Sequence, residues 1–125
     1  MIIFRLRTSK RTMQIFEELQ IKTNLKPFAL SKLAIALSLK GDVDSLVFNT
    51  DSNGIELNKQ TITGKYDSMY KCLIEKHCGH HLKDNEYFPK YVKAHIDRGA
   101  VMLHNEFRFS KDLISYLAGL EGVAI

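Results

Sequence analysis

The sequence has few residues of the kinds that cross-link a small protein. It contains two cysteines, Cys72 and Cys78, among 125 residues. Two thiols make no disulfide framework, and they can equally stay reduced in a cytoplasm. A chain of this length buries about two-thirds of its unfolded surface, so its core needs neither disulfides nor a metal. A disulfide-stapled miniprotein is therefore excluded, and we expect one domain over residues 1–125.

Long apolar runs are also missing. The first seven residues are apolar only until Arg5 and Arg7 interrupt them, so they lack the long apolar stretch of a signal peptide. No later run approaches the length of a membrane span. We therefore expect a cytoplasmic protein that is neither exported nor embedded in a membrane.

Patterns typical of an active site are scarce. Gly41, Gly54 and Gly64 are too scattered to form a loop that cradles a phosphate. We therefore expect no catalytic residues, no cofactor and no enzyme activity.

The one concentration of reactive side chains is His77, Cys78, His80 and His81, with Cys72 upstream. Only His77 and His81 have a spacing typical of zinc ligands, and a helix end at Gly79 would separate them. Histidines also stabilise a helix C-terminus without any metal. We expect no metal site, although the sequence leaves open whether these side chains bind one. A metal- or thiol-dependent enzyme built on them remains an alternative.

Charge is unevenly distributed along the chain. Residues 1–40 hold eight basic and two acidic residues, a net charge of +6, whereas residues 41–125 hold ten basic and twelve acidic residues, a net charge of −2. A basic face attracts polyanions by releasing counterions, and nucleic acid is the commonest polyanion in a cytoplasm. A positive face kept only for solubility, or one that meets an acidic partner protein, is equally compatible with this pattern.

Hydrophobic spacing predicts a mainly α-helical bundle of about five helices, with a short N-terminal strand and an ordered loop at about residues 41–64. Within the loop we expect a short strand at residues 45–48 and a turn at Asn53-Gly54. The expected strand covers residues 2–7. The expected helices cover residues 10–22, 27–40, 66–78, 85–104 and 110–120.

Three positions fix details of this prediction. Thr8 or Ser9 should cap the first helix, and Pro89 should lie in the first turn of the fourth, because proline lacks the N–H that later turns need. Gly99, in the middle of that helix, indicates either a weak point or a close packing contact.

The order strand, helix, helix over residues 2–40 resembles ribbon-helix-helix regulators, in which strands from two chains pair and enter the DNA major groove. Arg5 and Arg7 on one strand face would suit DNA contacts. An edge strand guarded by charge is the simpler interpretation. A sequence-specific transcriptional regulator of this type is our alternative function.

Two segments resemble the DndE family of DNA sulfur modification proteins. LQIKTNLKP at residues 19–27, continuing into LAIALSL at 33–39, is similar to the family pattern L-x-x-[KR]-T-G-L-x-P and the helix after it. GIELNKQTITGKYD at residues 54–67 is similar to G-x-E-[FL]-[NS]-[RK]-x-T-[LI]-x-G-E-Y-D, and HIDRGA at 95–100 is a shorter match. Asn24 replaces a glycine of the pattern, and Lys65 stands where the family tends to have glutamate.

The resemblance implies a compact, mainly helical subunit of the bacterial DNA phosphorothioation system. Sulfur chemistry belongs there to separate partner proteins, so this subunit is expected to bind double-stranded DNA, including nicked DNA, as a homo-oligomer, specifically a tetramer. Lys22 matches a basic position of the family pattern, and the other candidates rest on charge clustering. The candidate DNA-binding residues are Arg5, Arg7, Lys10, Arg11, Lys22, Lys26 and Lys32.

Overall fold

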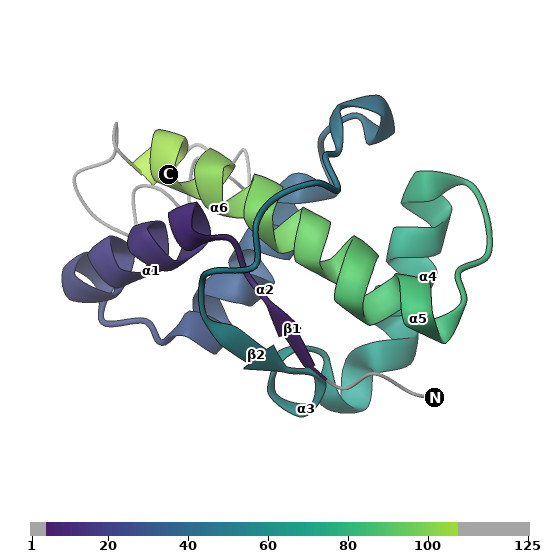
Figure 1. Ribbon diagram of the computed structural model, residues 1–125, viewed down its shortest axis with the longest axis horizontal. Coiled ribbons are helices and arrows are strands. Elements are labelled where there is room, and N and C mark those ends of the chain that lie inside the picture. Colours follow the sequence, from purple (N-terminus) through teal and green to yellow (C-terminus); the bar gives the residue numbers. More distant parts are fainter. Residues whose placement is uncertain (1–4, 108–125) are drawn as a thin grey trace, which may run out of the picture.

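The computed structural model describes residues 5–107 and confirms a mainly helical fold with a short N-terminal strand (Figure 1). The helix expected at residues 110–120 lies outside the described residues. Within residues 5–107 no helix is long and apolar enough to cross a membrane. In chain order the elements are β1 (Arg5–Arg7), α1 (Lys10–Thr23), α2 (Pro27–Ser38), η1 (Val43–Ser45), β2 (Glu56–Asn58), α3 (Lys59–Ile62), η2 (Gly64–Tyr66), α4 (Asp67–Cys78), α5 (Asp84–Glu86), η3 (Tyr87–Val92) and α6 (Lys93–Phe107).

The two strands form an antiparallel pair that joins the start of the chain to its middle. Leu6 lies opposite Leu57, and both side chains are buried, whereas Arg5 and Arg7 point outward. The expected alternation of β1 is therefore confirmed. A ribbon-helix-helix dimer needs this strand to pair with a second copy, but here β2 of the same chain takes that place.

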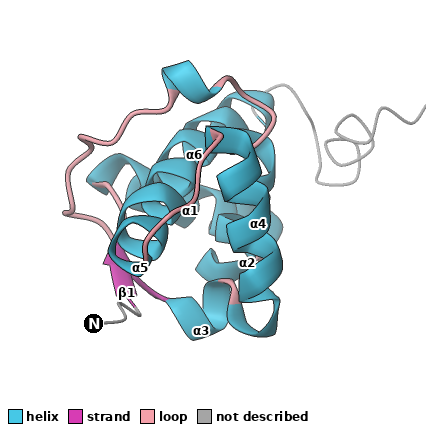
Figure 2. Cartoon of the chain, turned by 90° about the vertical axis from the view of Figure 1, so that its right-hand side faces the viewer, coloured by secondary structure: helices cyan, strands magenta, loops and turns pink. Residues whose placement is uncertain are grey.

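Residues 41–64 contain only short elements, as expected, but the strand expected at residues 45–48 is absent. A 3₁₀ turn, η1, occupies Val43–Ser45 instead, and the loop after it passes around the outside of the helices (Figure 2). The loop sequence was expected to fold on itself near Asn53-Gly54. It pairs with β1 because Leu57 and Leu6 bury their side chains on the same face.

Helices α1 and α2 begin and end at the residues that local chemistry favours. The Ser9 side chain accepts a hydrogen bond from the Thr12 backbone N–H, which confirms the expected N-cap. Asn24 ends α1 with a φ of 61°, a left-handed conformation that asparagine tolerates. Pro27 is the first residue of α2, where its missing N–H costs no helical hydrogen bond.

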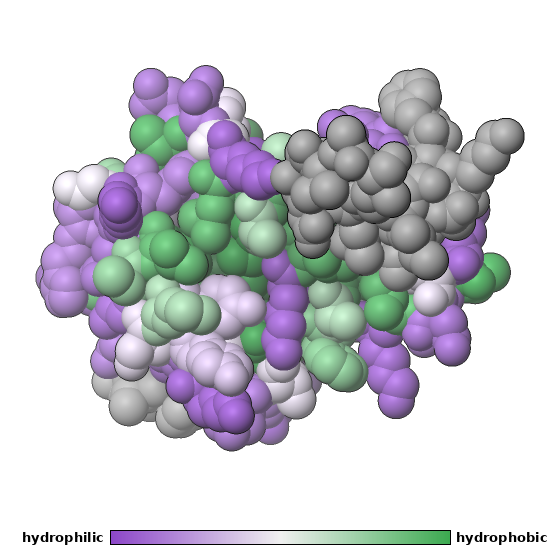
Figure 3. All heavy atoms as spheres, turned by 180° about the vertical axis from the view of Figure 1, so that it is seen from behind, coloured by the Kyte–Doolittle hydropathy of each residue, from purple (hydrophilic) through white to green (hydrophobic). Residues whose placement is uncertain are grey.

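Helix α4 ends at Gly79 as expected, yet its apolar residues are mostly at the surface. Ile74 is its one buried side chain, whereas Met69 and Leu73 are 54% and 45% exposed, as is Tyr66 just before the helix, at 54%. Figure 3 shows hydrophobic side chains reaching the surface on the face opposite to that of Figure 1. Helical spacing therefore predicted the helix correctly but not its burial.

Helix α6 is the centre of the fold and packs most extensively on α2 (Figure 1). A Cβ atom added at Gly99 would lie 1.8 Å from the Ala34 carbonyl oxygen, so Gly99 is a close packing contact. Pro89 lies beyond the first turn, contrary to expectation. The backbone widens there to a π-helix, η3, and such widened turns tolerate interruptions of the α-helical bonding.

Candidate nucleic-acid interface

All seven candidate DNA-binding residues are exposed, but they do not form a single cluster. Arg5 and Arg7 lie on β1, Lys10 and Arg11 on the first turn of α1, and the three lysines at its other end or on α2. At a rise of about 1.5 Å per residue, Lys10 and Lys22 are about 18 Å apart along the axis of α1. The candidate surface therefore extends along α1 and over β1 and α2.

The two strand arginines have contacts within the β ribbon. Arg5 Nη1 lies 3.9 Å from Glu56 Oε2, with both side chains well exposed. Arg7 Nη1 donates to the Gly54 carbonyl oxygen at 3.1 Å. Exposed pairs of this kind contribute little stability, so a phosphate can compete for the cations.

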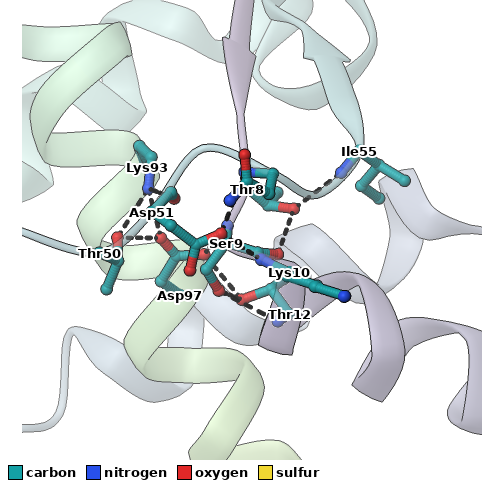
Figure 4. A network of polar contacts seen from close by, with 10 residues as sticks. Thr8, Ser9, Lys10, Thr12, Thr50, Asp51, Ile55, Lys93 and Asp97 are labelled. Atoms are coloured by element: carbon teal, nitrogen blue, oxygen red, sulfur yellow. Dashed lines mark hydrogen bonds and ion pairs between the residues drawn. The ribbon is translucent and has the colours of Figure 1, made fainter.

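The N-terminus of α1 is fixed by Asp51. The Lys10 backbone N–H donates to Asp51 Oδ2 at 2.9 Å, and the Asn53 backbone N–H donates to the same oxygen at 3.0 Å. These backbone hydrogen bonds lower the pKa of Asp51. Figure 4 shows the Lys10 side chain directed away from this carboxylate. Its ammonium group is therefore presented at the surface.

Lys22, Lys26 and Lys32 lie around the turn between α1 and α2. Lys22 Nζ pairs with Glu18 Oε1 at 3.1 Å, one helical turn away, and this hydrogen bond is the main cause of the lowered pKa of Glu18. Lys26 precedes Pro27, and the Lys32 ammonium lies 5.7 Å from the centre of the exposed Phe28 ring. Of the three, Lys22 has a neighbouring carboxylate that reduces its local field.

Below this surface, a buried ion pair holds α1, the loop and α6 together (Figure 4). Asp97 Oδ1 accepts hydrogen bonds from the Ser9 backbone N–H at 3.0 Å and from Thr12 Oγ1 at 2.7 Å. Asp97 Oδ2 accepts from Thr50 Oγ1 at 2.6 Å and from Lys93 Nζ at 2.7 Å. The Asp97 side chain is only 3% exposed. Four donors thus satisfy a carboxylate that burial alone would penalise.

Next to the ion pair, Thr8 and Gly54 connect the strand to the loop. Thr8 donates its backbone N–H to the Ile55 carbonyl and accepts from the Gly54 backbone N–H at 2.8 Å. A Cβ atom at Gly54 would lie 2.2 Å from the Ser9 carbonyl oxygen. Only glycine fits this approach, so Gly54 fixes the position of β1 and the start of α1.

A second polar cluster closes the C-terminal end of α2. Arg98 donates to the backbone carbonyl oxygens of Ser38 and Asp42, which places a cation where the helix dipole favours one. Ser38 Oγ lies 2.8 Å from Nδ1 of the fully buried His95. Burial, with smaller contributions from His77 and Arg98, lowers the pKa of His95 to about 3. The imidazole is therefore neutral at physiological pH.

The histidines near Gly79 make separate contacts. His77 Nε2 donates to the Gly41 carbonyl oxygen at 2.7 Å, and His81 Nδ1 lies 2.7 Å from Glu75 Oε2. Cys78 Sγ lies within hydrogen-bonding distance of the Glu75 and His80 carbonyl oxygens. Over residues 5–107, no three His, Cys, Asp or Glu side chains converge as a metal site would require.

Sequence reasoning did not assign roles to Thr50, Lys93 or Asp97. Asp97 lies in the short HIDRGA segment, which marked it as part of a recognisable pattern without indicating what it contacts. Thr50 and Lys93 had no signal, because their roles arise only when the loop folds onto α6. Through the Asp97 carboxylate, all three hold the N-terminal end of α1 in place.

Comparisons with known proteins agree on one family. Residues 5–111 match the family described as DNA sulphur modification protein DndE. Two solved structures share the fold at 19% sequence identity and cover 82% of this chain: DndE from Escherichia coli B7A involved in DNA phosphorothioation modification, and a glycine-to-lysine mutant of DndE involved in DNA phosphorothioation. Their TM-scores are 0.65 and 0.63, and 98% and 99% of their own chains are covered. None of the curated proteins matches in sequence.

Proposed function

Because the chain belongs to the DndE family of DNA sulphur modification proteins, we propose that it is the non-catalytic duplex-DNA-binding subunit of a bacterial phosphorothioation complex. It contacts the DNA backbone through its basic surface, prefers nicked duplexes, and leaves the sulfur chemistry to partner subunits in the cytoplasm. The observation that carries the proposal is the exposure of all seven candidate cations.

The distribution of these cations suits contacts to the DNA backbone. Phosphate contacts position a protein on a duplex, and they need exposed cations spread over a surface, not a single deep pocket. The candidates extend about 18 Å along α1 alone. The backbone at the start of α1, which carries Lys10 and Arg11, is fixed by Asp97, Asp51 and Gly54. A fixed support lowers the ordering cost of binding.

Assembly would strengthen this binding. We propose a homotetramer, in which four copies of a weak basic face engage one polymer and gain avidity without any new contact. The alternative, a ribbon-helix-helix regulator, is less well supported, because the strand that should pair between two chains is paired with β2.

The test is binding of the purified protein to labelled duplexes of unrelated sequence, intact or nicked, across a salt series. We expect a steep salt dependence, equal affinity across sequences and tighter binding to nicked duplexes. The double variant Lys22→Glu/Lys26→Glu should weaken binding to all sequences and flatten the slope of log K against log salt by about 1.8, because two phosphate contacts are lost.

The matched control is Lys76→Glu/Lys83→Glu, which changes the net charge equally at two exposed positions outside the candidate surface. This control should bind much more tightly than Lys22→Glu/Lys26→Glu. Equal losses in the two double variants would show that only total charge matters. No binding by the natural sequence even at low salt would overturn the proposed function and favour an acidic protein partner.

A further inference from the structure

A hollow lies beside the candidate surface, between α2 and the segment that leads into α4. Its volume is about 310 Å³, and it is lined by Lys32 of α2, by Gln60 and Thr61 of α3, and by Lys65 and Tyr66 of η2. Liquid water takes about 30 Å³ per molecule, so the hollow has room for a hydrated phosphate group. Lys32 belongs to the candidate surface, whereas Lys65 was not part of it.

The charge of the hollow is positive. None of its lining residues is acidic, and Lys32 and Lys65 are both exposed. Among residues 5–107, neither lysine takes part in an ion pair; their ammonium groups lie over the rings of Phe28 and Tyr66, at 5.7 and 5.2 Å. Two cations without a nearby counter-charge attract an anion strongly.

The nearest carboxylate of this segment is already satisfied. Asp67 accepts hydrogen bonds from Thr63 Oγ1 at 2.6 Å and from the Tyr87 hydroxyl at 2.8 Å, and it pairs with Lys59 Nζ at 3.3 Å. Its charge is directed into the protein. The positive charges of the two lysines at the hollow are therefore not neutralised by Asp67 and can attract an anion from solvent.

An exposed aromatic ring stands at the same place. Tyr66 is 54% exposed, and the Lys65 ammonium lies near its face. Surfaces that bind single-stranded nucleic acid combine cations for the phosphates with aromatic rings for the bases. On a duplex, whose bases are stacked inside, such a ring can contact the sugar beside a bound phosphate. The hollow offers both within three residues of chain.

The geometry points to a DNA-backbone site in which one phosphate group binds between Lys32 and Lys65, with the adjoining deoxyribose against Tyr66. This site rests on the proposed function and extends it to α3 and η2.

The test is fluorescence anisotropy of a short labelled DNA duplex titrated with the natural protein and with Lys65→Glu. Lys65 is exposed, so glutamate at this position should leave the fold intact, and thermal melting by circular dichroism checks this. Lys65→Glu should weaken binding about tenfold at low salt and flatten the salt slope by about 0.9. The control Lys76→Glu, with the same change of charge on the last turns of α4, should weaken it much less.

A double-variant cycle tests whether the lysines share one phosphate. If they do, Lys32→Ala/Lys65→Ala should lose less affinity than the product of the two single losses. A loss equal to that product would overturn the shared site, as would equal behaviour of Lys65→Glu and Lys76→Glu while the natural protein still binds DNA. Failure of the natural protein to bind would overturn the site together with the proposed function.

Discussion

The buried residues of 54–67 and 95–100, two of the segments that resemble the family pattern, differ sharply from the basic surface in burial and partners. Gly54, Asp97 and Gly99 are buried and fixed by contacts from distant parts of the chain. Lys26 and Lys32 are exposed, and within residues 5–107 their side chains make no hydrogen bond or ion pair with a distant element. The buried residues of these segments therefore specify the fold, while the proposed DNA contacts, including Lys22 and Lys26 in the recognised segment 19–27, lie on exposed residues.

This contrast extends through the recognised segments. In residues 54–67, Leu57 and Ile62 are buried, Asn58 caps α3 by accepting from the Gln60 backbone N–H, and Asp67 holds Tyr87. Each of these residues has a structural role in this fold, so the proposed function has to be tested at the surface.

The largest expected effect is the loss of the buried ion pair. Asp97→Ala leaves Lys93 without its buried partner and should lower the free energy of unfolding by about 3–5 kcal/mol. Urea denaturation followed by circular dichroism measures it. The double variant Lys93→Met/Asp97→Leu should lose less, since it buries no uncompensated charge. A loss below about 1 kcal/mol for Asp97→Ala would show that the ion pair does not stabilise this framework.

The close contact of α6 with α2 should come next. Gly99→Ala places a methyl group against the Ala34 backbone, which cannot move aside as a flexible side chain would, and should cost about 3 kcal/mol. Val101→Ala, on the exposed side of the same helix, is the matched control and should cost well under 1 kcal/mol. Equal melting temperatures for the two variants would contradict a tight contact at Gly99.

The third effect depends on pH. His95 has a pKa of about 3 in the folded protein against 6.5 when unfolded, so below pH 6.5 the unfolded state binds more protons. Stability should fall by about 2 kcal/mol between pH 7 and pH 5, at about 1.4 kcal/mol per unit below 6.5. Glu18 and Asp51, with lowered pKa values, lose their contributions only as pH falls below their ordinary values of 4.5 and 3.8.

Urea denaturation at several pH values between 5 and 7 measures this fall. His95→Gln has no titrating imidazole and should show a much flatter dependence over that window. The same slope in His95→Gln as in the natural sequence would show that other groups control the acid sensitivity.

Features of the fold that depend on neighbours in sequence could be predicted, whereas features that depend on distant contacts could not. The caps at Ser9 and Gly79 and the first residue of α2 were predictable, because turn chemistry depends on neighbours in sequence. The pairing of β1 with β2 was not, since it joins residues about fifty positions apart and no hairpin turn marks it. The π-helix around Pro89 was missed because proline normally marks the first turn of a helix.

The candidate interface was predictable in composition but not in layout. Counting charges identified the basic first third, and all seven residues are exposed. Their spread along α1 follows from the predicted helix, but the proximity of Lys65 to Lys32 depends on packing between α2 and α3 that no sequence period reveals. Helical spacing predicted α4 but not which of its apolar residues are buried, since Met69 and Leu73 lie at the surface.

The smallest expected effect concerns the basic surface and its ion pair between Glu18 and Lys22. Glu18 is the carboxylate that pairs with Lys22, so Glu18→Gln frees the ammonium group and removes a charge that repels phosphate. DNA affinity should rise about two- to fivefold, while stability changes by less than about 0.5 kcal/mol, because exposed pairs contribute little. Glu106→Gln makes the same change of charge at another exposed position and is the control for total charge. If both variants bind DNA equally well, Lys22 makes no specific phosphate contact. If only Glu18→Gln gains affinity and its melting curve is unchanged, DNA affinity at this surface can change without any change in the stability of the buried framework.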